Sequence, residues 1–62
     1  MTKKEFRIIE NLLTKEYKKL TNLTLLNQNS APWELKPQIQ EIINTAKYYN
    51  NLIYARILEM KN

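Results

Sequence analysis

The sequence predicts an all-α protein, an antiparallel hairpin of two helices that self-associates into a four-helix bundle. Apolar residues recur at helical spacing in two long segments, and both prolines lie between those segments. The chain has 62 residues and contains neither Cys nor His, so no disulfide or zinc site stabilises it. Because a two-helix hairpin of this size buries little apolar surface, we expect a single domain, 1–62, that needs a partner.

The first helix is expected from about residue 2 to residue 28. Thr2-Lys3-Lys4-Glu5 is a capping-box pattern, in which we expect the Thr2 hydroxyl to accept a hydrogen bond from the Glu5 amide and the Glu5 carboxylate to accept one from the Thr2 amide. Asn-Gln-Asn-Ser at 27–30 favours the side-chain-to-backbone hydrogen bonds that end a helix. The apolar seam of this helix consists of Phe6, Ile9, Leu13, Tyr17, Leu20 and Leu23.

The connector is expected over about residues 29–36 and the second helix over about 37–60. Pro37 suits the first turn of a helix, because its missing N–H has no partner there in any case. We expect Trp33 to fold over the end of the hairpin as a plug of the core, with an exposed recognition aromatic as the alternative. The seam of the second helix consists of Ile39, Ile42, Ala46, Tyr49, Ile53, Ile57 and Met60.

Antiparallel folding pairs the two seams, with Phe6 level with Met60 and Leu13 level with Ile53. Further apolar residues lie off the seam of the second helix, and a helix that is apolar on several sides is usually covered on several sides. These residues, together with the connector tryptophan, are the predicted contacts to a second copy or to another protein: Trp33, Tyr48, Leu52, Tyr54 and Leu58.

Three polar residues in or beside the seams are predicted to set the register of the assembly: Glu16, Asn50 and Arg56. Glu16 projects from the first seam and needs a partner, because an unpaired buried charge is costly. The Tyr49 hydroxyl, the Asn50 amide or Arg56 of a neighbouring chain can supply one, and the alternative is that Glu16 reaches solvent. For Arg56 we expect an ion pair with Glu5, Glu16 or Glu59.

The formal net charge is +4, and the cations of the first helix gather on one side of it. That sector contains Lys4, Arg7, Asn11, Lys15, Lys18 and Asn22. Such a stripe can follow the phosphates of RNA or DNA. The favoured interpretation is nevertheless a solvated Lys-rich face, and nucleic-acid binding and a contact to an acidic protein are the alternatives.

The residue types present point away from catalysis. Without His, Cys or a glycine-rich loop, the sequence predicts no catalytic, metal or cofactor site. No apolar run reaches the length of a membrane span, and the chain lacks cysteine and a signal peptide, which predicts a cytoplasmic protein. Binding of the basic amphipathic helix to a membrane surface is a further alternative, and Glu16 in the apolar arc argues against it. Abundant Asn, Lys, Ile and Tyr are typical of AT-rich genomes, which suggests a low-GC bacterium or its phages and plasmids. The leading hypothesis is a small non-enzymatic regulator or adaptor, and nucleic-acid binding is the alternative.

The short helical hairpin with its opening Met1-Thr2-Lys3-Lys4-Glu5 resembles the Rop family of plasmid copy-control proteins. That resemblance implies a dimeric four-helix bundle and RNA binding through the face of the first helix. The proline-rich connector departs from the tight turn of that family.

Overall fold

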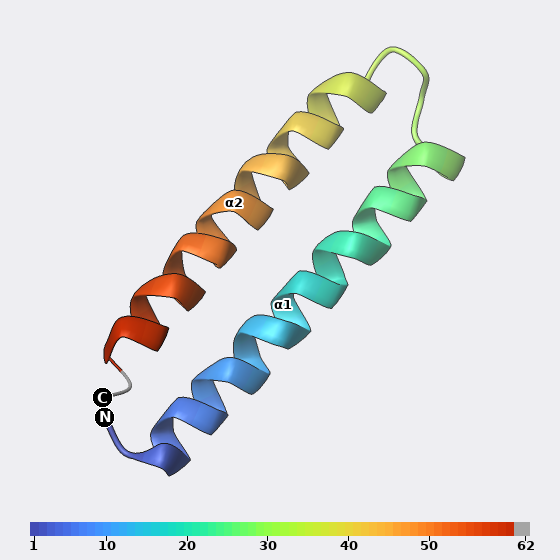
Figure 1. Ribbon diagram of the computed structural model, residues 1–62. Helices are drawn as coiled ribbons and strands as arrows, with labels where there is room; N and C mark the ends of the chain where they lie inside the picture. Colours follow the sequence, from blue (N-terminus) through green and yellow to red (C-terminus); the bar gives the residue numbers. More distant parts are fainter. Residues whose placement is uncertain (61–62) are drawn as a thin grey trace.

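The computed structural model describes residues 1–60 and shows two antiparallel helices, α1 (Lys3–Ser30) and α2 (Lys36–Met60). They lie side by side, with the connector at one end and the beginning of α1 and the end of α2 at the other (Figure 1). The predicted all-α hairpin is therefore confirmed. Within the described residues, neither helix is long and apolar enough to cross a membrane.

Helix α1 begins with the predicted cap and ends two residues later than predicted. The Glu5 amide donates to the Thr2 hydroxyl at 3.1 Å, as predicted. The Glu5 carboxylate accepts from the Thr2 hydroxyl at 2.9 Å rather than from the predicted Thr2 amide. At the other end Asn27 stays helical, and its side-chain amide donates to the Lys36 carbonyl at 3.0 Å. This bond ties the last turn of α1 to the first turn of α2.

The connector is short because a single turn links the helices. The amides of Leu35 and Lys36 both donate to the Pro32 carbonyl, at 2.9 and 3.2 Å, and α2 starts directly after them. The Lys36 ammonium donates to the Gln28 carbonyl at 2.7 Å, so it satisfies a carbonyl that the end of α1 leaves free. Trp33 is 82% exposed, so the prediction that it plugs the core is wrong.

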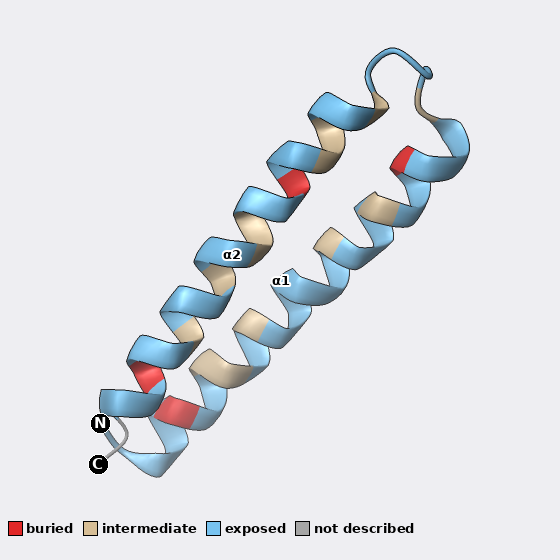
Figure 2. Ribbon diagram, turned by 45° about the horizontal axis from the view of Figure 1, so that its top comes forward, coloured by how far each residue is buried: buried red, intermediate tan, exposed pale blue. Residues whose placement is uncertain are grey.

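The buried residues lie at the two ends of the helix pair. Phe6 and Ile57 are buried near the chain ends, and Ile43 and Asn27 near the connector. Figure 2 shows these positions, with half-buried ones between them, on the sides of the helices that face each other. In the middle of the hairpin the facing side chains are only half-buried, so a single copy has a small core.

The register and the rotation of α2 differ from the predicted pairing of seams. The Asn50 side-chain amide donates to the Leu13 carbonyl at 3.4 Å, and the Tyr54 hydroxyl donates to the Glu10 carboxylate at 2.8 Å. Leu13 is therefore level with Asn50 rather than with Ile53. Each of these two polar side chains has a hydrogen-bond partner on α1, so α2 turns Asn50 and Tyr54 toward α1 and leaves part of its predicted seam exposed.

The hairpin is elongated and one layer thick. Its Cα atoms span 46 × 15 × 8 Å, and the radius of gyration is 14.5 Å. A compact domain of this length has a radius of gyration of about 10.6 Å. The shape therefore leaves two broad faces uncovered, and each consists of one side of α1 and one side of α2.

Candidate interaction surface

One broad face of the hairpin carries large apolar side chains along most of its length. The α2 part of this face consists of those residues of the predicted seam that do not contact α1. They recur at heptad spacing. We call the following residues the apolar face: Leu12, Leu23 and Leu26 of α1, and Ile42, Tyr49, Ile53 and Met60 of α2. All seven are exposed in the single chain, and Ile42 is 70% exposed.

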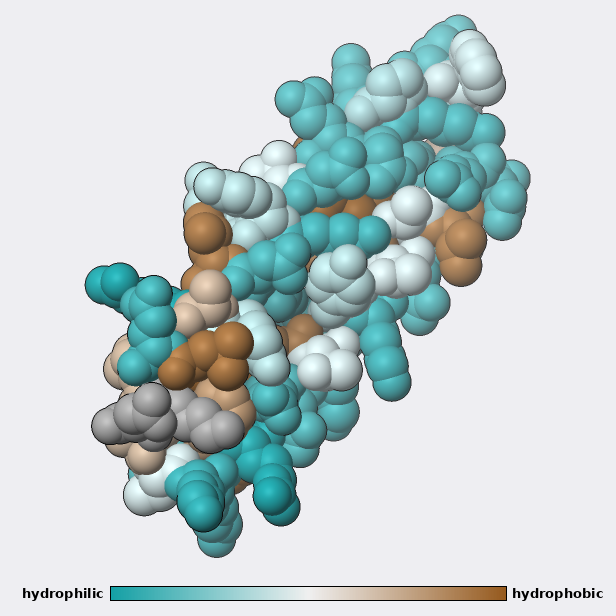
Figure 3. Space-filling model, in the orientation of Figure 1, coloured by the Kyte–Doolittle hydropathy of each residue, from teal (hydrophilic) through white to brown (hydrophobic). Residues whose placement is uncertain are grey.

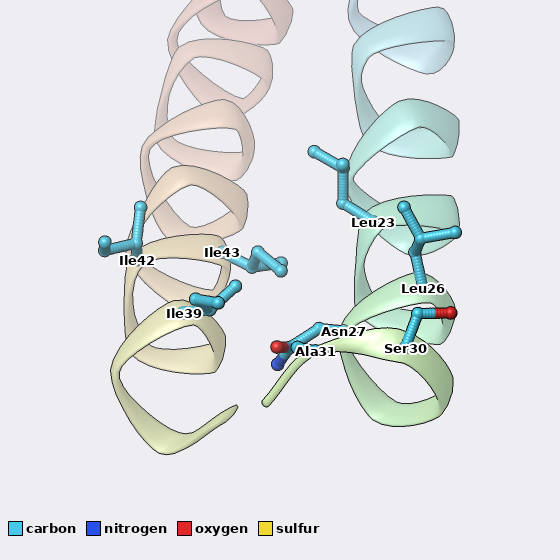
Figure 4. A pocket seen from close by; sticks show the side chains of 8 residues that line it. All are labelled: Leu23, Leu26, Asn27, Ser30, Ala31, Ile39, Ile42 and Ile43. Carbon is cyan, nitrogen blue, oxygen red and sulfur yellow. The ribbon is translucent and has the colours of Figure 1, made fainter. Parts of the chain in front are cut away.

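A groove of about 400 Å³ near the connector joins the two halves of this face. Leu23 and Leu26 line it from α1, and Ile39, Ile42 and Ile43 line it from α2 (Figure 4). Figure 4 shows Ile39 and Ile43 directed toward α1, whereas Ile42 lies on the outer part of α2. The groove therefore places the exposed leucines of α1 and the exposed isoleucine of α2 on the same side of the molecule.

The opposite broad face has a polar character. A second hollow on that side is lined by Leu13, Thr14, Tyr17, Asn50, Asn51 and Tyr54. The Lys47 ammonium lies 5.5 Å from the centre of the Tyr17 ring, which is a cation–π contact. Figure 3 shows a face of the molecule that is mostly hydrophilic, with hydrophobic surface in separate patches. The two faces of the hairpin thus differ in their side chains.

The contact between Tyr54 and Glu10 is half-buried and joins the two helices. The hydrogen bond to the Glu10 carboxylate raises the pKa of the Tyr54 phenol above its ordinary value, and desolvation and the negative charge of Glu10 act in the same direction. The protonated phenol is the form that donates this bond. The contact therefore fixes the C-terminal half of α2 against α1 at every pH at which the Tyr54 phenol is neutral.

The five predicted interface residues do not form a continuous surface in the single chain. Tyr54 is half-buried against α1, and Leu58 lies one turn beyond it on the same side of α2. Tyr48 and Leu52 are one turn apart on the side of α2 that faces away from α1, and both are exposed. Trp33 projects from the connector, where the Lys36 ammonium lies 5.6 Å from its ring centre.

The three predicted register-setting residues have different surroundings. Glu16 is exposed and accepts a hydrogen bond from Lys19 at 3.2 Å within α1. Arg56 pairs with Glu59 at 3.6 Å, which is one of its three predicted partners. Asn50 is half-buried and bonded to the α1 backbone. Of these three residues, only Asn50 helps to fix how the two helices of the single chain pack.

The cations of α1 form an exposed stripe on the side away from α2. Within residues 1–60, Lys4, Arg7, Lys15 and Lys18 are in no ion pair. Lys4 and Arg7 also line a shallow hollow with Asn11. These side chains are free to meet an anionic partner.

Sequence reasoning missed the apolar face, because it assigned the face's α2 residues to the contact with α1. The available signal was a second row on α2, Ile43–Asn50–Tyr54–Ile57, which competes with the row through Ile42 and Ile53 for the side that faces α1. Apolarity favours the row through Ile42, whereas the hydrogen bonds of Asn50 and Tyr54 favour the other.

Comparison with protein-family models, with curated proteins and with solved structures gave no match. The resemblance to the Rop family thus remains one of length, layout and opening residues. Among residues 1–60, no group of three or more acidic, His or Cys side chains is placed to hold a metal ion.

Proposed function

We propose that this protein is a small non-enzymatic regulator or adaptor that acts through self-association and protein–protein contacts. The observation that carries the proposal is the apolar face. Monomeric proteins rarely expose a large continuous apolar surface, and such surfaces usually mark interaction sites. In this chain the exposed apolar residues outnumber the buried ones, and seven of them lie on one face.

The accessible area of the chain supports the same proposal. A single copy exposes 5293 Å², whereas a folded monomer of 7.5 kDa exposes about 4,200 Å². The excess is roughly 1,000 Å², and a stable interface buries about 800 Å² on each partner. A second copy that covers the apolar face would remove this excess, and two hairpins packed in this way form a four-helix bundle.

Thermal unfolding of the native chain tests the proposal. Because association stabilises only the folded chain, the midpoint of the helical circular dichroism signal should rise with protein concentration. We expect a rise of roughly 5 °C for each tenfold increase. A midpoint that does not change over a hundredfold range of concentration would refute self-association.

Nucleic-acid binding is a second candidate, and the unpaired stripe of α1 cations favours it. Phosphate contacts release counterions, so binding should weaken steeply as salt is raised. We expect an electrophoretic mobility shift with generic RNA or DNA at low salt, much reduced at about 200 mM salt. In a Lys15→Glu, Lys18→Glu variant the shift should disappear.

The control for this prediction is the double variant Lys47→Glu, Arg56→Glu, which changes the net charge by the same amount but on α2. If the stripe of α1 is the binding site, this control retains more binding than the α1 variant at equal net charge. Equal loss in both variants would mean that only the total charge matters, and equal binding by the α1 variant would remove the candidate.

A further inference from the structure

We infer that the groove near the connector binds a small, uncharged and mainly apolar molecule that carries one N–H or O–H group, and that this group donates to the side-chain oxygen of Asn27. The inference is independent of the proposed self-association, because every residue that lines the groove belongs to one chain. Two features lead to it, namely apolar walls from both helices and a buried acceptor that has no donor.

The walls of the groove are apolar and come from both helices. Leu26 of α1 and Ile42 of α2 are exposed, whereas Ile43 is buried between the helices. The volume of about 400 Å³ lies in the range of small-molecule sites in proteins, which are about 300–1,000 Å³ with mainly apolar linings. Among the residues that the structure describes, no charged side chain lines the groove. A molecule that suits these walls is therefore uncharged.

Asn27 supplies the acceptor. Only 5% of its surface is exposed, and its amide nitrogen donates to the Lys36 carbonyl at 3.0 Å. Its amide oxygen is buried and has no hydrogen-bond partner within residues 1–60. Figure 4 shows the Asn27 side chain directed from α1 toward α2 in the groove, with the Ser30 hydroxyl directed away from it. Because buried polar atoms nearly always have a partner, this oxygen indicates a donor that comes from outside the chain.

The orientation of the Asn27 amide is fixed by the bonds that close this end of the hairpin. Exchange of its nitrogen and oxygen would bring the oxygen against the Lys36 carbonyl, which is also an acceptor. The Lys36 ammonium in turn donates to the Gln28 carbonyl at 2.7 Å and holds the two helix ends together. The exposed side chains beside Asn27, Leu23 and Leu26, change rotamer within nanoseconds, and such changes admit a donor to the oxygen.

The groove thus selects a molecule by two properties. An apolar body covers Leu26 and Ile42 and removes their surface from water. A single donor at one end of that body pairs with the Asn27 oxygen, which no group of the chain satisfies. A charge or a second donor would be buried against leucine and isoleucine side chains without a partner, which is costly.

Indole and benzofuran test the site, because the two rings have nearly the same size and only indole carries an N–H. The host is the ¹⁵N-labelled Ile53→Glu variant. Ile53 does not line the groove, and the substitution disrupts the proposed dimer, so the groove is open whether or not the native chain associates. We expect indole to shift the nuclear magnetic resonance signals of the Asn27 side-chain amide and of the Ile42 and Ile43 backbone, with a dissociation constant on the order of 1 mM.

Benzofuran should bind about tenfold more weakly than indole, because it leaves the Asn27 oxygen without a donor. Benzofuran is the more apolar of the two rings, so apolar contact alone would favour it. Equal or tighter binding of benzofuran would overturn the inference. An indole titration to about 10 mM that gives no saturable shift at the groove would overturn it as well. Neither result bears on self-association, which the molar mass of the native chain measures separately.

The Asn27→Leu substitution, made in the same host, removes the acceptor and keeps a side chain of similar size. Both rings should still bind, and indole should lose its advantage over benzofuran. The control is Asn22→Leu, the same change at an exposed position of α1 outside the groove, which should retain the preference for indole. A preference that persists in Asn27→Leu would contradict the role of the oxygen. Circular dichroism checks that the helices are retained, and if Asn27→Leu unfolds, the comparison of the two rings still decides.

Discussion

Ile53→Glu should convert the protein into a monomer at concentrations where the native chain is a dimer. Ile53 is 51% exposed in the single hairpin and lies in the α2 part of the apolar face. In the proposed dimer the substitution buries two carboxylates against apolar side chains of the other copy. We expect the dissociation constant to rise about a hundredfold or more, which corresponds to about 3 kcal/mol. Size-exclusion chromatography with light scattering measures the change.

The matched control is the neighbouring substitution Leu52→Glu. Leu52 is 47% exposed, so a single hairpin tolerates the two changes almost equally well. Leu52 faces away from α1 and outside the apolar face, and its substitution should leave the dimer in place. A dimer that survives Ile53→Glu and dissociates with Leu52→Glu would show that the originally predicted surface with Tyr48 and Leu52 is the true interface.

Ile43→Ala should destabilise the fold strongly, because Ile43 is the most buried apolar residue of the hairpin, with only 4% of its surface exposed. Loss of an isoleucine side chain from a core costs about 2–5 kcal/mol. In a chain of this length, each kcal/mol lowers the unfolding midpoint by roughly 4–8 °C. We therefore expect a fall of roughly 10 °C or more in thermal unfolding followed by circular dichroism.

Leu25→Ala is the control for this loss of stability. Leu25 is 53% exposed and lies outside both the helix contact and the apolar face, so we expect a change within about 0.5 kcal/mol. If the two alanine variants unfold at the same temperature, then Ile43 does not form the contact between α1 and α2, and the rotation assigned to α2 is wrong.

Local signals in the sequence were sufficient to predict the helices. The cap at Thr2, the prolines between the helices and the apolar periodicity each act over a few residues, and the structure has helices at Lys3–Ser30 and Lys36–Met60. The exact ends differed, because Asn27 bonds to the Lys36 carbonyl and holds the last turn of α1 in place instead of ending it.

The rotation of α2 could not be predicted, because it depends on contacts between residues far apart in the sequence. The bonds from Asn50 to Leu13 and from Tyr54 to Glu10 join positions on different helices, and a helix that is apolar on several sides does not reveal which side faces its neighbour. The position of Trp33 was predicted wrongly for a related reason. The turn at Pro32 directs the Trp33 ring away from the hairpin, where it lies beside the Lys36 ammonium.

The central claim is that the apolar face is covered by a second copy of the chain, and the molar mass of the native protein tests it most directly. Sedimentation equilibrium over a series of concentrations should give about 15 kDa, twice the 7.5 kDa of one chain, with dissociation only on dilution. A helical protein that remains at 7.5 kDa at every concentration would contradict the claim.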